Sequence, residues 1–141
     1  MKKCIIIQGP TNWLHYIKKA YLNCECDIIF STWEEDEYKY SEKDLVIINK
    51  KPKENGVKNL FLQQISTLNA LEYAKNNDYQ YAIKIRSDMI PLKINDFINL
   101  FSKEIEFFYW HNFREGYLVD YFMGGTIQNM IDLWKIGRAH V

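Results

Sequence analysis

The chain has 141 residues, and its 18 Lys and Arg residues balance its 18 Asp and Glu residues. This length is enough for one domain with a real core, and the zero net charge argues against a nucleic-acid-binding protein that relies on a basic surface. No apolar run approaches the length of a membrane span, and the run that follows Lys2 and Lys3 is too short for a signal peptide. These features predict a cytoplasmic protein. Its three cysteines are expected to be reduced thiols, since Cys24 and Cys26 lack the second pair that a zinc site needs.

The N-terminal half of the chain predicts strands separated by one helix and one loop. Short apolar runs rich in β-branched residues predict strands at 3–7, 26–33 and 44–50. Helical spacing of apolar residues predicts a helix over 11–21, which Thr11 or Asn12 can cap. The polar segment 34–43 is expected to be a solvated loop.

The C-terminal half contains the longest helical pattern. Residues 59–77 predict a helix with Asn59 as its cap and with one apolar stripe, formed by Phe61, Ile65, Leu68, Leu71 and Ala74. A fourth strand is expected over 79–89. The remaining elements are expected to be a short helix at 95–103 capped by Asn95 or Asp96, an aromatic strand at 105–113, a loop or short strand at 117–125, and a helix from 126.

The order of these elements predicts an α/β fold with a mostly parallel sheet flanked by helices. Such sheets bind ligands at the carboxyl ends of their strands. Polar segments fall at three of these ends, at residues 8–10, 31–33 and 86–88. The chain has neither the glycine-rich fingerprint of dinucleotide-binding proteins nor that of P-loop enzymes.

The fourth strand has an unusual pattern, because Lys84, Arg86 and Asp88 alternate with apolar residues. One interpretation is an edge strand with a solvated face, on which an ion pair contributes only about 0–1 kcal/mol. The other is a site for a polyanion. There Asp88 would bind Mg²⁺ or Mn²⁺, and the planar guanidinium of Arg86 would hold phosphates. The pattern by itself leaves both interpretations open.

Five segments occur in the order seen in the WavE lipopolysaccharide synthesis family, which the chain resembles over nearly all of residues 4–134. They read CIIIQGP, FSTWE, QQISTLNALEYA, YAIKIRSDM and DYFMGG. That family is similar to GT-A glycosyltransferases. The resemblance implies an incomplete Rossmann-like GT-A fold that transfers sugar from a nucleotide-sugar donor to a lipopolysaccharide or capsular polysaccharide. It further implies a lipid-linked glycan acceptor and peripheral association with the inner face of the cytoplasmic membrane.

The resemblance also assigns site residues. The metal-binding D-x-D motif of GT-A enzymes corresponds to Arg86-Ser87-Asp88. Asp88 would therefore hold the cation, and the positive charge of Arg86 would replace part of the charge of the metal. The implied donor-binding residues are Gln8, Gly9, Pro10, Thr32, Trp33, Gln64, Arg86 and Ser87. We expect these residues to meet in one cleft.

The segment DYFMGG supplies the remaining candidates. Gly124 and Gly125 would let an acceptor sugar approach closely, and Asp120 would take the proton of its hydroxyl group. The alternative is a helix start after a glycine turn, in which Asp120 caps locally.

The last six residues, 136–141, match the translation of a common sequencing adapter. We therefore expect the glycosyltransferase domain to span residues 1–135, to continue in the natural protein beyond Lys135, and to pack nothing specific against the tail. Two other functions stay open, a nucleotidyltransferase on a related fold and a non-catalytic carbohydrate-binding or assembly module.

Overall fold

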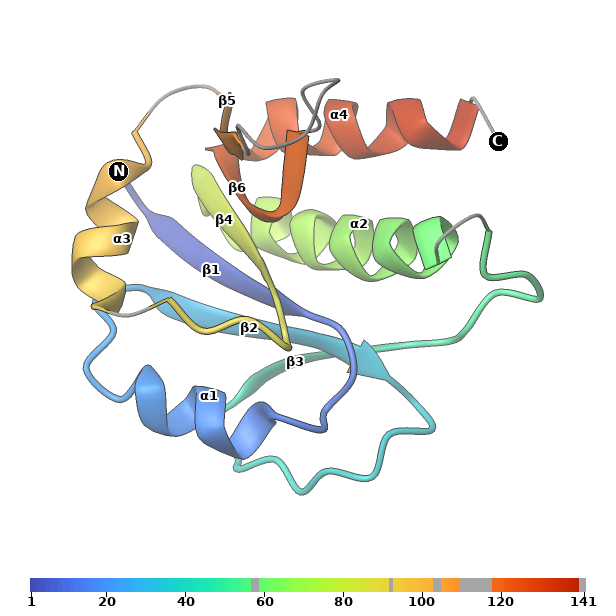
Figure 1. Cartoon of the computed structure of the whole chain (residues 1–141), viewed down its shortest axis with the longest axis horizontal. Coiled ribbons are helices and arrows are strands. Elements are labelled where there is room, and N and C mark those ends of the chain that lie inside the picture. Colours follow the sequence, from blue (N-terminus) through green and yellow to red (C-terminus); the bar gives the residue numbers. More distant parts are fainter. Residues whose placement is uncertain (57–58, 92, 103–104, 110–117, 140–141) are drawn as a thin grey trace.

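The computed structural model describes residues 1–56, 59–91, 93–102, 105–109 and 118–139. Strands and helices alternate along much of the chain (Figure 1). In chain order they are β1 (Lys3–Gln8), α1 (Leu14–Ala20), β2 (Asp27–Trp33), β3 (Leu45–Asn49), α2 (Leu60–Asn76), β4 (Tyr81–Arg86), α3 (Ile94–Leu100), β5 (Ile105–Tyr109), β6 (Leu118–Thr126) and α4 (Ile127–Ala139).

The strands form one sheet in the order β3-β2-β1-β4-β6-β5. The first four strands run parallel to one another, whereas β6 is antiparallel to β4 and β5 is antiparallel to β6. This arrangement confirms the predicted α/β class with a mostly parallel sheet, and it is compatible with a Rossmann-like fold. Chain order runs outward from β1 in one direction through β2 and β3, and β4 joins on the other side. The sheet therefore has a switch point between β1 and β4.

Helices cover both faces of the sheet. On one face, α2 and α4 pack over alternate residues of the central strands, such as Cys4, Ile6 and Ala82. On the other face, α1 and α3 pack over the intervening residues, such as Ile5 and Ile83. The central strands are buried on both sides, which explains why they read as nearly continuous apolar runs. No helix among the described residues is long and apolar enough to cross a membrane.

The structure corrects the interpretation of the fourth strand as a solvated edge. β4 lies between β1 and β6, and Lys84 is fully buried in it. The Nζ atom of Lys84 lies 4.8 Å from the centre of the Trp134 ring on α4, within the range of a cation–π interaction. Periodicity predicted the direction of this side chain but could not predict the helix that covers it.

Several element boundaries also differ from the sequence prediction. Residues 118–125, expected as a loop or short strand, belong to the nine-residue strand β6 (Leu118–Thr126), which pairs on both sides. Helix α1 begins at Leu14, without a side-chain cap from Thr11 or Asn12. In α3 the N-cap position is Lys93, and the Asn95 side chain instead accepts a hydrogen bond from the Glu25 backbone N–H. Asn59 does occupy the N-cap position of α2, but its side chain makes no capping bond.

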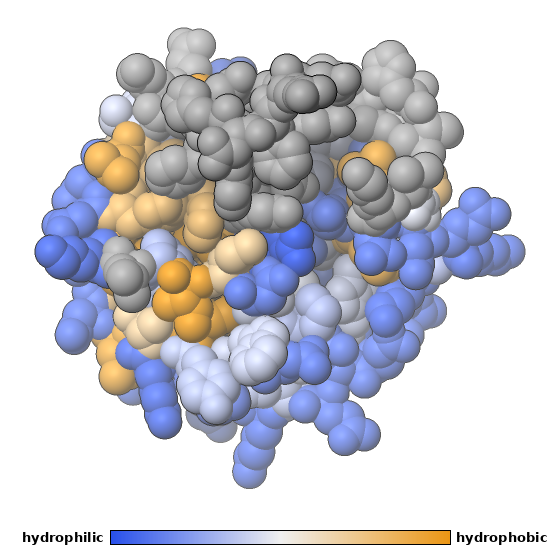
Figure 2. All heavy atoms as spheres, in the orientation of Figure 1, coloured by the Kyte–Doolittle hydropathy of each residue, from blue (hydrophilic) through white to orange (hydrophobic). Residues whose placement is uncertain are grey.

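The surface seen in Figure 2 is mixed in character. Apolar side chains gather on the left of this view, where Figure 1 places α3, and hydrophilic side chains cover much of the remainder. Exposed large apolar residues in the segment around α3 include Ile90 and Leu100.

At the end of the chain, the helical backbone of α4 continues through Ala139 and so enters the adapter-like tail. The last residues of that tail, 140–141, lie outside the described part.

Candidate ligand pocket at the carboxyl ends of the parallel strands

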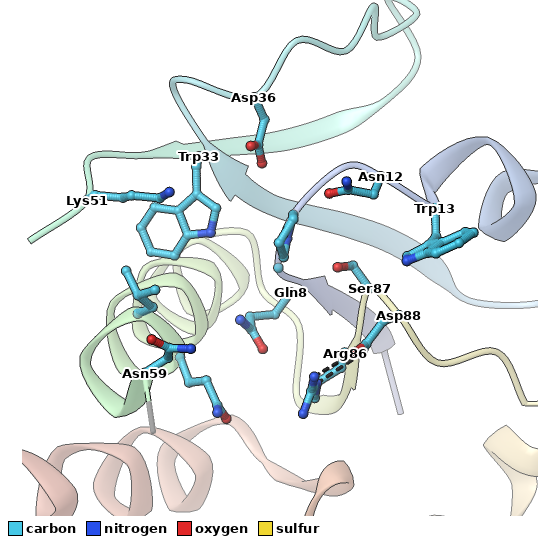
Figure 3. A pocket seen from close by; sticks show the side chains of 14 residues that line it. Gln8, Asn12, Trp13, Trp33, Asp36, Lys51, Asn59, Arg86, Ser87 and Asp88 are labelled. Carbon is cyan, nitrogen blue, oxygen red and sulfur yellow. Dashed lines mark hydrogen bonds and ion pairs between the residues drawn. The ribbon is translucent and has the colours of Figure 1, made fainter. Parts of the chain in front are cut away.

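A pocket of about 430 Å³ opens at the carboxyl ends of β1, β2 and β4, on the face of the sheet that α2 covers. Its volume lies within the range of about 300–1,000 Å³ that small-molecule sites occupy. It is lined by Gln8, Gly9, Pro10, Asn12, Trp13, Trp33, Asp36, Lys51, Asn59, Leu62, Gln63, Arg86, Ser87 and Asp88 (Figure 3). The pocket therefore lies at the switch point of the sheet, where open α/β folds bind ligands.

The floor of the pocket is built where the ends of β1 and β4 meet. Gln8 and Arg86 are paired in the parallel register, and the Ser87 backbone N–H donates to the Gln8 carbonyl at 2.8 Å. Gly9 has φ +133°, and its backbone N–H donates to the Ser31 carbonyl at 3.1 Å. The turns that follow these strands are thus held together by the backbone.

Arg86 and Asp88 form a two-bond ion pair at this floor (Figure 3). Arg86 Nε donates to Asp88 Oδ1 at 3.0 Å, and Arg86 Nη2 donates to Asp88 Oδ2 at 2.6 Å. Both side chains are partly exposed, at 32% for Arg86 and 40% for Asp88. The ion pair expected from the edge-strand interpretation is therefore present. It lies in the pocket, however, and at the end of a central strand.

This ion pair bears on the Mg²⁺ or Mn²⁺ expected at Asp88. Arg86 engages both carboxylate oxygens, and no group of three His, Cys, Asp or Glu residues gathers to hold a metal among the residues described. A divalent cation held mainly by substrate phosphates still needs a carboxylate or two from the protein. In this arrangement a divalent cation would compete with Arg86 for the Asp88 carboxylate, and a metal ion at Asp88 stays a prediction.

The other charged residues of the pocket come from loops. Lys51, which follows β3, forms an ion pair with Glu35. Asp36, which follows β2, points into the pocket, and its backbone N–H donates to the Trp33 carbonyl. The lining thus includes two cationic and two anionic side chains, and both cations are paired with carboxylates.

Three of the lining residues carry a buried oxygen atom that no described group supplies with a hydrogen bond. These atoms are Gln8 Oε1, Asp36 Oδ2 and Gln63 Oε1. A buried acceptor without a donor costs about 1–3 kcal/mol. Rotation of a glutamine amide exchanges its oxygen and nitrogen, so Gln8 and Gln63 can each offer a ligand either an acceptor or a donor.

Two tryptophans line the pocket in different ways. Trp33 is only 3% exposed, so most of its ring is packed and little of it is left for stacking on a ligand. Trp13 precedes α1 and is 54% exposed, and its ring centre lies 6.1 Å from that of Tyr16. Trp13 therefore offers the larger free aromatic surface.

The structure brings together most of the donor-binding residues expected from the sequence, with two exceptions. Thr32 is fully buried, and its hydroxyl shares a hydrogen bond of 2.8 Å with the Tyr40 hydroxyl. Gln64 is buried, and its Nε2 donates to the Trp134 carbonyl at 3.1 Å. Neither side chain lines the pocket, and the neighbouring residues Trp33 and Gln63 do.

The candidates from DYFMGG lie on β6. Gly124 and Gly125 are buried opposite Ile83 and Ala82, away from the pocket. A Cβ atom on Gly124 would lie 2.6 Å from the Phe101 ring, so packing explains this glycine. Asp120 precedes Phe122, the partner of Ile85, by two residues, so its backbone lies towards the carboxyl end of β4. The Asp120 side chain lies outside the described part of the structure.

Sequence reasoning missed seven lining residues: Asn12, Trp13, Asp36, Lys51, Asn59, Leu62 and Gln63. Most follow the ends of parallel strands or begin α2. Their position after predicted strands was a usable indication, because loops at the carboxyl ends of an α/β sheet surround its binding site. Their polar composition, however, is equally typical of solvated loops.

The cysteines lie outside this pocket. Burial raises the pKa of Cys4 to about 12 and that of Cys26 to about 11, and it also raises the pKa of Cys24. These thiols are protonated at neutral pH and are therefore poor nucleophiles.

Comparison with known proteins adds no assignment to this geometry. No protein-family model matches the chain, and no curated protein matches it significantly.

Proposed function

We propose that this protein is a glycosyltransferase that uses a nucleotide-sugar donor. The observation that carries the proposal is the polar pocket at the β1–β4 switch point, where Gln8 and Arg86 lie side by side in register. In open α/β sheets this position is the usual binding site for nucleotides and related ligands.

The lining of the pocket suits the separate parts of such a donor. The guanidinium of Arg86 can bind a phosphate through two hydrogen bonds. Gln8, Gln63 and Asp36 carry acceptor oxygens that hydroxyl or N–H groups of a ribose, base or sugar can satisfy. The exposed ring of Trp13 can contact the face of a sugar or a base.

In the proposed reaction, the bond between the anomeric carbon and the diphosphate oxygen breaks. A hydroxyl oxygen of the acceptor forms the new bond to that carbon, and the hydroxyl proton passes to a carboxylate. The diphosphate leaves with additional negative charge, which Arg86 stabilises from a fixed position. Asp120 and Asp36 are the two candidates for the carboxylate, the first from the sequence and the second from its place in the pocket.

The identity of the acceptor rests on the resemblance of the sequence to the WavE family. On that basis, the acceptor is a lipid-linked glycan of lipopolysaccharide or capsular polysaccharide, and the enzyme works at the inner face of the cytoplasmic membrane. No step of this mechanism depends on a metal ion.

The proposal is tested by incubating the protein with a panel of nucleotide sugars and measuring the nucleoside diphosphate released. We expect one nucleotide sugar to be consumed, and Arg86→Gln to slow its consumption by about 100-fold, the effect of removing one donor to a developing negative charge. Release of pyrophosphate from a nucleoside triphosphate and a sugar phosphate would instead indicate a nucleotidyltransferase. Glycan binding without any turnover would indicate a carbohydrate-binding or assembly module.

A further inference from the structure

The carboxylate of Asp88 occupies Arg86 in the way a phosphate would. It accepts from Nε and Nη2 of the guanidinium, at 3.0 Å and 2.6 Å, so one whole edge of the planar group is engaged. Carboxylates and phosphates bind this edge in the same two-bond geometry. One edge of Arg86 therefore cannot hold Asp88 and a ligand phosphate in this geometry together.

The pair is placed so that a ligand can open it. Arg86 and Asp88 both line the pocket, and their side chains are 32% and 40% exposed. Ion pairs with this exposure contribute little to stability, because water and salt screen them. The diphosphate of the ligand carries at least two negative charges and the Asp88 carboxylate carries one, so the ligand can compete for the guanidinium.

We propose that Asp88 is a built-in competitor, which occupies the Arg86 guanidinium until a phosphate group of the ligand displaces it. The inference rests on the proposed function, because it takes the ligand to be a nucleoside diphosphate or its sugar ester. It goes further by stating whether Asp88 raises or lowers the affinity for phosphate. In the absence of a divalent cation, Asp88 weakens phosphate binding.

Two other roles for Asp88 predict the opposite change in phosphate affinity when Asp88 is replaced. If Asp88 positions Arg86 for the ligand, removal of its carboxylate lowers affinity, because the guanidinium loses its orientation. If Asp88 is required as a metal ligand, phosphate binding depends on the cation and is lost with the carboxylate. Of these three roles, competition is the one that predicts tighter binding without a cation when Asp88 is replaced, and a control variant must separate it from a general effect of charge.

The experiment measures binding of inorganic pyrophosphate and of a panel of nucleoside diphosphates by calorimetry, in EDTA and at low salt. Asp88→Asn and Asp88→Ala should both bind the probes about two- to fivefold more tightly than the wild type, the range expected for release of an exposed ion pair. Arg86→Lys should bind them more weakly, since its ammonium keeps the charge but has no planar edge. Circular dichroism and thermal unfolding verify that each variant is folded.

For pyrophosphate, which has no ribose, base or sugar for Asp36 to contact, Asp36→Asn is the matched control, because it removes the same charge from the same pocket without belonging to the Arg86 pair. Equal tightening by Asp36→Asn would show a general charge effect and would overturn the inference. Weaker binding by both Asp88 variants would also overturn it, as would binding that appears only when Mn²⁺ is added, or no pyrophosphate binding by any variant.

The same titrations separate this inference from the proposed function. Pyrophosphate binding that tightens in the Asp88 variants, without turnover of any nucleotide sugar, would support the competition and contradict the glycosyltransferase. Turnover of a nucleotide sugar, with binding that does not tighten in the Asp88 variants, would support the enzyme and contradict the competition.

Discussion

Gly9 and Ser87 approach each other so closely that a Cβ atom on residue 9 would lie 2.5 Å from the Ser87 hydroxyl oxygen. Gly9 also has φ +133°, a conformation that other residues rarely adopt. The resemblance of the sequence implied that Gly9 binds the donor. The structure shows that Ser87 fills the space instead, so Gly9 joins the turns that end β1 and β4.

This contact predicts that Gly9→Ala lowers the free energy of unfolding by about 1–3 kcal/mol, from backbone strain together with the clash. Urea unfolding of the purified variant measures the loss. Adding Ser87→Ala should restore part of it, because the hydroxyl oxygen is removed while the strain at residue 9 persists. A Gly9→Ala protein as stable as the wild type would show that the two turns can separate without cost.

Substitution of the two tryptophans of the pocket should have different effects, one on stability and the other on ligand binding. Trp33→Ala should lower the free energy of unfolding by about 3–5 kcal/mol, because its ring is packed. Trp13→Ala should change it by less than about 0.5 kcal/mol, because its ring is half exposed. Loss of the Trp13 ring should instead weaken nucleotide-sugar binding about two- to tenfold, the value of one aromatic contact. Unfolding curves and calorimetric titrations of both variants would show the reverse pattern if Trp13 served packing and Trp33 served binding.

The buried thiols and phenols predict a loss of stability at alkaline pH. Burial raises the pKa of Cys26 to about 11 from an ordinary value of 9.0, and it also raises the pKa of Tyr79, whose hydroxyl donates to Asp27 Oδ2 at 2.5 Å. The unfolded chain then releases protons at lower pH than the folded one. The stabilisation is complete below about pH 9 and is lost as the pH rises towards 11.

Urea unfolding between about pH 8 and pH 10.5 measures this dependence. Cys26→Ala should make the decline between pH 9 and pH 10.5 less steep, and the part that comes from the raised pKa values of Cys4, Cys24 and the tyrosines should persist. Stability that rises across this range, or a Cys26→Ala profile identical to that of the wild type, would contradict the assigned direction of the Cys26 pKa.

Strand ends were predictable from the sequence because two simple rules apply to them. Alternation and β-branched residues locate the strands, and parallel strands place their carboxyl ends at one edge of the sheet. Gln8, Trp33 and Arg86 were therefore expected to meet, and all three line the pocket. The same reasoning misplaced Thr32, since its side chain points to the opposite face of β2 from that of Trp33.

Features that depend on tertiary packing were not predictable in this way. Gln63 and Gln64 differ by one position on α2, and only the packing of that helix against Trp134 determines which of them faces the pocket. Lys84 has the spacing of a solvated residue, yet α4 covers it. Asp36 and Lys51 lie in loops whose composition does not distinguish a binding site from ordinary surface.

The most direct test of the proposed function is a calorimetric titration of a panel of nucleotide sugars into the wild-type protein and into Arg86→Gln. We predict saturable binding of at least one nucleotide sugar to the wild type, and binding to Arg86→Gln that is weaker by about tenfold or more, the loss expected when a charge-assisted contact to phosphate is removed. Nucleotide-sugar binding that Arg86→Gln leaves unchanged, or no binding of any member of the panel to the folded wild type, would contradict it.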